Sequence, residues 1–135
     1  MERDKKKEDK ERDANYWLNK GVELGKQGKH EEALECFNKA LEINPNLAEA
    51  WYNKGNALSN LGKYKEALEC YDKTLEINPN LAGAWNNKGW ALIEQEKYEE
   101  ALECFGKAIE TNPYFAVAWI GKGSVLAQLK NMKKH

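Results

Sequence analysis

The sequence lacks several features that would each point to a class of protein. No apolar run approaches the roughly 18 residues that cross a bilayer, and the first 13 residues are charged throughout, where a signal peptide would need an apolar stretch. The 21 basic and 22 acidic residues leave a net charge of -1, so no basic excess favours nucleic acid or an anionic membrane surface. We therefore expect a cytoplasmic protein that binds neither nucleic acid nor membranes.

Side chains that carry out catalysis are also scarce. The only serines are Ser59 and Ser124, and neither histidine is expected at a catalytic distance from them. Neither a G-x-G-x-x-G turn nor a G-x-x-x-x-G-K-[ST] phosphate loop is present. The sequence therefore predicts no enzyme active site and no cofactor.

The three cysteines, Cys36, Cys70 and Cys104, are 34 residues apart. Zinc sites use close pairs such as C-x-x-C. Packed helices lie about 8 to 10 Å apart, beyond the roughly 7 Å Cα separation that a disulfide allows. We expect these cysteines to be small, buried or half-buried apolar residues, with no metal site.

What the sequence does contain is a repeat with a period of 34 residues. Segments 14–47 and 48–81 agree without a gap at 21 of 34 positions, which excludes chance. A third segment covers 82–115, and a fourth begins at residue 116 and stops after about half a period. The most regular positions hold Trp17, Trp51, Trp85 and Trp119; Lys20, Lys54, Lys88 and Lys122; Gly21, Gly55, Gly89 and Gly123; and Pro45, Pro79 and Pro113.

Each period contains two helical patterns. Trp51, Gly55 and Leu58 follow one another at spacings of 4 and 3, which places them on one face of a helix, and a second such face begins at Ala67. Gly62 can end the first helix in a left-handed conformation, and the proline at 79 breaks the chain before the next period. The expected helices are 15–27, 31–43, 48–61, 64–77, 82–95, 98–111 and 116–129.

The residues that carry this period resemble the tetratricopeptide repeat, a helix-turn-helix unit of 34 residues. In the second period they are Trp51, Gly55, Leu58, Gly62, Tyr64, Ala67, Tyr71 and Pro79. The resemblance implies an all-α, right-handed solenoid of seven helices, with the first helix of each pair on the concave side. It covers 14–129, with repeats 14–47, 48–81 and 82–115 and a capping helix at 116–129.

Several parts of the chain fall outside this pattern. The charged extension 1–13 is expected to be a solvated helix or a flexible tail, and 130–135 a basic tail. Glu96 stands where the other repeats have a turn glycine, so we expect the third repeat to be the least regular. The capping helix should turn Lys122 and Gln128 to water, together with the lysines of the tail.

Positions one and five residues after each tryptophan are expected to face the groove. Unlike the framework, they do not repeat, which favours a generic scaffold with a specific groove. Lateral packing is the alternative for Leu18, Val22 and Ile120. The groove positions hold Leu18 and Val22, Tyr52 and Asn56, Asn86 and Trp90, and Ile120 and Ser124.

A row of asparagines, Asn19, Asn53 and Asn87, follows the next face and is interrupted at Gly121. An amide can both donate to and accept from a peptide backbone, so such a row would hold an extended chain with little regard to its sequence. Hydrogen bonds within the helices or between repeats are the alternative interpretation.

One branch of the family binds the acidic C-terminal tail of chaperones through a carboxylate clamp of lysines or arginines and asparagines. In either frame of this sequence the matching positions supply asparagines such as Asn53, Asn56 and Asn87 but no lysine. Binding of a chaperone tail is therefore disfavoured.

The resemblance implies a non-enzymatic protein-protein interaction or scaffold module that binds a peptide or helix in its concave groove. The alternative is structural self-association, in which an exposed first helix with Trp17, or the groove itself, contacts a second copy and forms a homo-oligomer. Neither function needs a cofactor or a metal.

Overall fold

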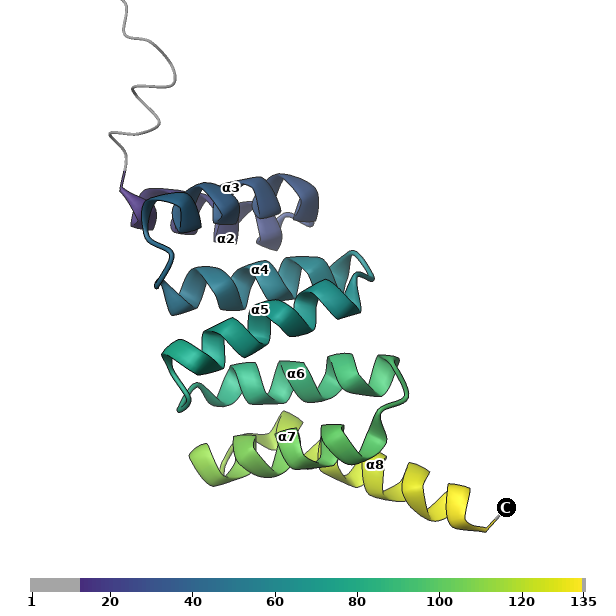
Figure 1. Ribbon diagram of the computed structural model, residues 1–135. Helices are drawn as coiled ribbons and strands as arrows, with labels where there is room; N and C mark the ends of the chain where they lie inside the picture. The colour runs from purple at the N-terminus through teal and green to yellow at the C-terminus, as the bar shows by residue number, and fades with distance from the viewer. Residues whose placement is uncertain (1–12, 135) are drawn as a thin grey trace, which may run out of the picture.

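The computed structural model describes residues 13–134, which form seven α-helices and no strand (Figure 1). The expected extension over 1–13 lies outside the described residues except for Asp13, whose side chain accepts a hydrogen bond from the Tyr16 amide at 2.8 Å and caps the first helix. The helices are α2 (Ala14–Lys26), α3 (His30–Ile43), α4 (Ala48–Asn60), α5 (Tyr64–Ile77), α6 (Ala82–Glu94), α7 (Tyr98–Thr111) and α8 (Ala116–Lys133).

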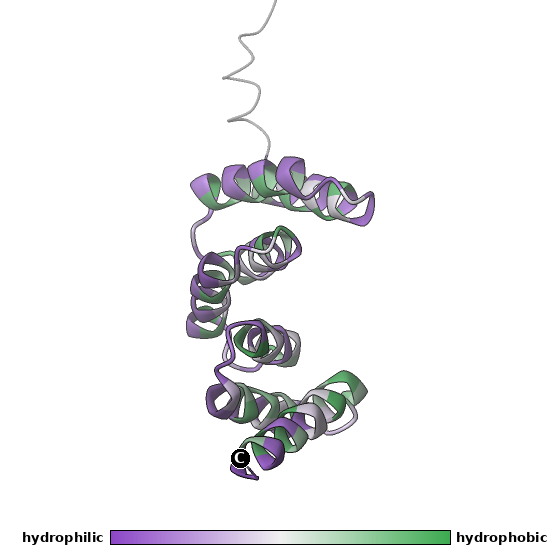
Figure 2. Ribbon diagram, turned by 90° about the vertical axis from the view of Figure 1, so that its right-hand side faces the viewer, coloured by the Kyte–Doolittle hydropathy of each residue, from purple (hydrophilic) through white to green (hydrophobic). Residues whose placement is uncertain are grey.

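The helices form a one-dimensional stack of antiparallel pairs, so the predicted all-α repeat fold is confirmed (Figure 1). Within each pair the two helices pack along their length, and the second helix of a pair packs on the first helix of the next. Figure 2 shows that the helices carry both hydrophilic and hydrophobic ribbon, as amphipathic helices between neighbours and solvent must. Each pair therefore buries its apolar face against the next one.

A glycine in the first helix of each pair lies against an aromatic ring of the second helix. A Cβ added to Gly55 would lie 2.6 Å from the Tyr71 ring, and one added to Gly89 would lie 2.7 Å from the Phe105 ring. Gly121 of α8 meets the same Phe105 ring from the other side. The repeated glycine is therefore required because the ring occupies the space of a side chain.

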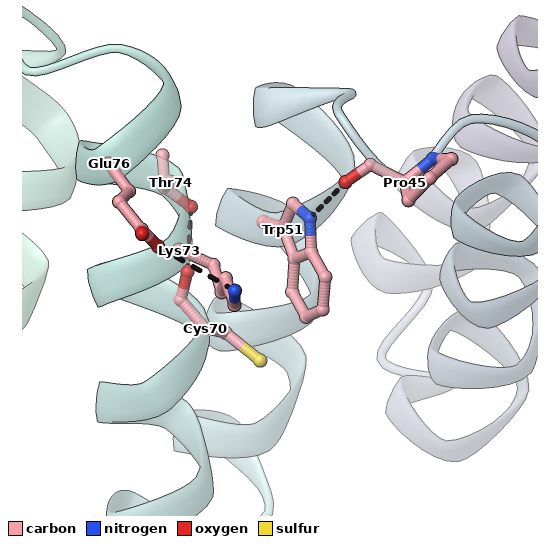
Figure 3. Close-up of polar contacts among 6 residues, drawn as sticks. All are labelled: Pro45, Trp51, Cys70, Lys73, Thr74 and Glu76. Carbon is pink, nitrogen blue, oxygen red and sulfur yellow. Dashed lines mark hydrogen bonds and ion pairs between the residues drawn. The ribbon is translucent and has the colours of Figure 1, made fainter.

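The tryptophan ladder joins successive repeats. The Trp51 indole Nε1 donates to the Pro45 carbonyl at 2.8 Å (Figure 3), and Trp85 and Trp119 bond the equivalent proline carbonyls at the same distance. The ammonium group of Lys54 lies 5.3 Å from the centre of the Trp51 ring, and the equivalent lysines of the other repeats lie over their own tryptophans. The lysine period is thus a cation-π period, which the sequence did not indicate.

The turn between paired helices is the same in all three repeats. Gly28, Gly62 and Glu96 all adopt positive φ, at 80°, 78° and 59°. The amide that follows each of them bonds back into the first helix at 2.8 to 3.0 Å. The expectation that Glu96 makes the third repeat irregular is therefore wrong, because the glutamate adopts the left-handed conformation at its own cost while the helix ends keep their register.

The last helix differs from the prediction in two respects. It continues past residue 129 to Lys133, so most of the expected basic tail is helical. It also turns apolar side chains to solvent, although the exposed Gln128 and Lys130 follow the prediction of a polar outer face. The exposed apolar residues of α8 are Val117, Trp119, Ile120, Leu126 and Met132.

The cysteines are free and buried, as predicted. Cys70 also accepts a hydrogen bond at its backbone carbonyl from the fully buried Thr74 hydroxyl at 2.9 Å, beside an exposed pair of Lys73 and Glu76 (Figure 3). Burial raises the pKa of Cys70 and of Cys104 to about 11. These thiols are protonated and unreactive at neutral pH.

No helix between residues 13 and 134 combines the length and the apolar character that crossing a bilayer would require.

Candidate functional site

The first helices of the repeats form the inner layer of the stack. Contacts join α2 to α4, α4 to α6 and α6 to α8, whereas no comparable contact joins α3 to α5 or α5 to α7. In a curved stack the more closely spaced layer lies on the inner side. The side chains between α4 and α6 are therefore the ones that face the groove.

A hollow of 520 Å³ lies in this groove. Its walls come mainly from α4 and α6, with one residue contributed by α8. They contain amides, hydroxyls and aromatic rings, no lysine or arginine, and a single carboxylate. The lining residues are Asn56, Ser59, Asn60, Tyr64, Tyr71, Asn86, Asn87, Trp90, Ala91, Glu94 and Val117.

A hydrogen-bond network forms the floor of the hollow. The Tyr71 hydroxyl donates to Asn56 Oδ1 at 2.7 Å and lies 3.3 Å from the Ser59 hydroxyl. Asn87 Nδ2 reaches across from α6 and donates to the same Asn56 Oδ1 at 2.8 Å and to the Tyr52 hydroxyl at 3.1 Å. The network therefore fixes α6 to the second repeat through polar groups.

The network ends on the side of Asn86 that has no partner. Asn86 Nδ2 donates to Asn87 Oδ1 at 3.0 Å, but the Asn86 Oδ1 atom has no hydrogen-bond partner among residues 13–134. The same holds for Trp90 Nε1, whose indole ring packs edge-on against Phe105 with 5.5 Å between ring centres. A buried polar atom without a partner costs about 1–3 kcal/mol, so these two atoms are the unusual feature of the hollow.

The electrostatic surroundings keep the floor neutral. Burial is the main cause that raises the pKa of Tyr71 well above its usual value, against the opposing effect of the hydrogen bond with Ser59. The Tyr71 hydroxyl is therefore a hydrogen-bond donor at every physiological pH. The nearest ion pair, Lys88 Nζ to Asp72 Oδ1 at 2.7 Å, involves neither a lining residue nor the network.

A second hollow of 300 Å³ adjoins the first, between α2 and α4. Asn56 and Asn60 line both hollows, so the two form a continuous groove across the first three first helices. The remaining lining residues are Gly21, Val22, Gly25, Lys26, His30, Ala33, Phe37, Asn53 and Ala57.

The structure brings together the predicted groove residues of the second and third repeats and disperses the others. Leu18 is only 4% exposed and packs in the core with its neighbour Trp17, as the alternative of lateral packing expected. Val22 packs against the same core but also lines the second hollow. Ile120 is 61% exposed on α8, and Ser124 is exposed there too.

The asparagine row is occupied by bonds inside the protein. Asn53 Nδ2 donates to the Glu49 carbonyl of its own helix at 2.9 Å, and Asn87 belongs to the network. Asn19 is exposed. For Asn53 and Asn87 the alternative of helix and inter-repeat bonding therefore accounts for the side chain.

Sequence reasoning missed three residues that matter to the hollow. Tyr71 supplies the central hydroxyl, Ser59 lies beside it, and Glu94 brings the only charge. A signal was available for Tyr71, because the equivalent positions hold Phe37 and Phe105. A hydroxyl added to a buried ring at one repeat alone indicates a local polar partner.

Comparisons with known proteins bear on the fold and the family. A family model described as tetratricopeptide repeat matches residues 14–47, 48–81 and 82–115, which is well over half of the chain. An uncharacterized protein of Methanocaldococcus jannaschii is 54% identical over 37 residues, which are 27% of this chain and 43% of that protein. The chain therefore spans less than half the length of this curated relative.

Two solved structures are similar over most of the chain. The crystal structure of the Sgt2 tetratricopeptide repeat domain from Aspergillus fumigatus superimposes with a TM-score of 0.86 at 19% identity, over 90% of this chain and 82% of that one. The first such domain of Spaghetti (RPAP3), bound to the HSP90 peptide SRMEEVD, gives a TM-score of 0.85 at 25% identity, over 87% of this chain and 93% of that one.

Proposed function

This chain belongs to the tetratricopeptide repeat family of protein-interaction modules, and on that premise we propose that it binds an extended peptide segment in the groove between α4 and α6. The segment is uncharged or basic where it meets the hollow. The observation that carries the proposal is the lining itself, which is polar, specific to one pair of repeats and without a cation.

The charge of the groove separates this chain from a receptor for acidic tails. The related domain of Spaghetti was solved with SRMEEVD, which carries two glutamates, an aspartate and one arginine. The hollow between α4 and α6 offers such a peptide no lysine or arginine, and Glu94 would repel its carboxylates. A neutral or basic segment meets no such repulsion.

The experiment is a selection of displayed random heptapeptides on the immobilised protein, followed by titration of the selected peptides and of SRMEEVD. The blocking variant is Asn60→Trp, because Asn60 is exposed and lines both hollows, so that a larger side chain fills the groove without entering the core. The matched control is Asn38→Trp, at an exposed asparagine of α3 that lines neither hollow.

We expect selected peptides without acidic clusters, at least tenfold weaker binding to Asn60→Trp, unchanged binding to Asn38→Trp and weaker binding of SRMEEVD than of the selected peptides. Selected peptides that bind Asn60→Trp as well as the parent would contradict groove binding.

Self-association is a second candidate function, supported by the exposed apolar residues of α8 rather than by Trp17. Trp17 is only 4% exposed, whereas Trp119 is 49% exposed and Ile120 is 61% exposed. A second copy that covers this face would remove apolar surface from water. Sedimentation velocity tests it: a dimer that dissociates in Ile120→Lys but persists in Tyr114→Lys, at the 93% exposed loop residue, supports self-association, and a monomer at every concentration contradicts it.

A further inference from the structure

Two unpartnered polar atoms share the hollow between α4 and α6, and each has one hydrogen-bonding role. Asn86 is 4% exposed and its Oδ1 atom can only accept, while Trp90 Nε1 can only donate. Both residues line the hollow. They are four residues apart on α6, so their side chains rise from neighbouring turns on the same face of the helix.

The internal partners of both residues are already used for other purposes. Asn86 Nδ2 is held by Asn87 Oδ1, so the side chain is fixed with its oxygen pointing away from the network. The Trp90 ring is fixed by its edge-on contact with Phe105. The acceptor and the donor are therefore preorganised, and neither needs to reorient before it can bind a ligand.

We propose that Asn86 and Trp90 form an amide clamp, in which Asn86 Oδ1 accepts an N–H and Trp90 Nε1 donates to a C=O of the same ligand. The clamp rests on the proposed function and names the chemistry that the groove recognises. The matching ligand edge occurs in an extended peptide, where one residue presents its N–H and C=O on the same side, and in the primary carboxamide of asparagine or glutamine.

The other residues of the hollow agree with a neutral amide. A carboxylate would place a negative charge against Asn86 Oδ1 and in the same hollow as Glu94, with one neutral donor in return. An ammonium group could satisfy Asn86 Oδ1 but would leave Trp90 Nε1 without an acceptor. An amide satisfies both atoms at once.

The clamp is also absent from the other repeats. The positions equivalent to Asn86 and Trp90 hold Leu18 and Val22 in the first repeat and Tyr52 and Asn56 in the second. The first pair cannot form hydrogen bonds, and the Tyr52 hydroxyl and Asn56 Oδ1 are occupied by Asn87. The pair on α6 is thus a feature of one site and does not belong to the framework.

The test follows the indole N–H signals of the protein by NMR while two probes are added separately, N-acetylalanine methylamide for the peptide edge and propionamide for the primary carboxamide. The Trp90 signal is identified as the one that disappears in Trp90→Phe. We expect that signal alone to move downfield, with the indoles of Trp51, Trp85 and Trp119 unchanged. The probe that binds more tightly identifies the source of the amide.

Variants separate the clamp from the groove as a whole. Asn86→Ala and Trp90→Phe should each weaken a probe and a selected heptapeptide by about tenfold, whereas Asn53→Ala, whose amide bonds within its own helix, should leave both unchanged. Circular dichroism confirms that each variant is folded. Heptapeptides that bind Asn86→Ala and Trp90→Phe as tightly as the parent, yet are blocked by Asn60→Trp, would overturn the clamp and leave groove binding intact. If Asn60→Trp has no effect either, the proposed function itself fails.

Discussion

The junction of the first and second repeats and the junction of the second and third use the same backbone with opposite chemistry. The helix bounds are repeated at a period of 34, and the glycine-ring contact is present in both. Equivalent positions hold Leu18, Val22 and Phe37 at the first junction and Tyr52, Asn56 and Tyr71 at the second.

The comparison shows which part of a repeat is free to change. The first junction buries Leu18 and Phe37 in an apolar core, and the second replaces that contact by the network centred on Asn56. Because the framework positions alone maintain the stack, the groove positions can carry polar groups without a change of fold. The polar junction is also the one that has atoms left over for a ligand.

The largest effect is expected from removing the last junction altogether. Deletion of 116–135 would uncover the Phe105 ring, which meets Gly121 of α8, and would remove Ala118 and Val125 from the core. Because a buried large apolar side chain contributes roughly 1.5–3 kcal/mol, the free energy of unfolding should fall by about 3 kcal/mol or more. Urea denaturation of the 1–115 fragment measures it, and unchanged stability would mean that α8 does not support the third repeat.

A second prediction compares the thiols of the folded and unfolded chain. Burial raises the pKa of Cys70 and Cys104 from 9.0 to about 11, which lowers their thiolate fraction at pH 8 by about 100-fold. Alkylation by iodoacetamide should therefore be at least about 100-fold slower in the native protein than in urea.

The sign of the linked stability follows from the same pKa values. Because the folded pKa is raised, the contribution to stability is complete below pH 9 and is lost as the pH rises toward 11. The free energy of unfolding should fall across this window, and less so when both residues are replaced by alanine. Native alkylation within tenfold of the unfolded rate would contradict the burial of these thiols.

A reciprocal exchange of rings tests the comparison of the two junctions directly. Tyr71→Phe removes the donor to Asn56 and should cost about 1–2 kcal/mol, while Phe37→Tyr should cost about 1–3 kcal/mol because its hydroxyl would be buried beside Val22 without a partner. Adding Val22→Asn to Phe37→Tyr should recover about 1 kcal/mol of the loss. Additive effects in this double-mutant cycle would show that the network does not couple the two positions.

The smallest effect is expected at the third turn. Glu96 adopts φ 59°, where glycine is preferred, so Glu96→Gly should raise the free energy of unfolding by about 0.5 kcal/mol after the added entropy of the unfolded chain. Gly62→Ala, at φ 78°, serves as the opposite control and should destabilise. A loss of stability in Glu96→Gly would show that the glutamate side chain makes a favourable contact.

The sequence predicted the framework because the framework is periodic. Trp51, Gly55 and Pro79 recur in one register, and the helices they imply lie within one residue of those observed except at the end of α8. At residue 130 a lysine takes the place of the turn glycine, and the helix continues to Lys133. The cation-π role of Lys54 was not predicted, since it depends on how a side chain folds back over its neighbour.

The groove was predicted only in part because its contacts join residues about 30 positions apart. That Asn56 and Trp90 face a common hollow followed from their position after the tryptophans. That Asn87 is held by Asn56 and Tyr52, while Asn86 keeps one atom unpaired, depends on side-chain orientations across two helices, which periodicity does not determine.

The most direct test of the account is a ¹⁵N-¹H NMR map of the protein with a selected heptapeptide. The account predicts that the largest shifts fall on the backbone amides of α4 and α6 and on the Trp90 indole, at the hollow that Asn56 and Trp90 line. Shifts confined to α3, α5 and α7, or to the exposed Trp119 indole of α8, would contradict it.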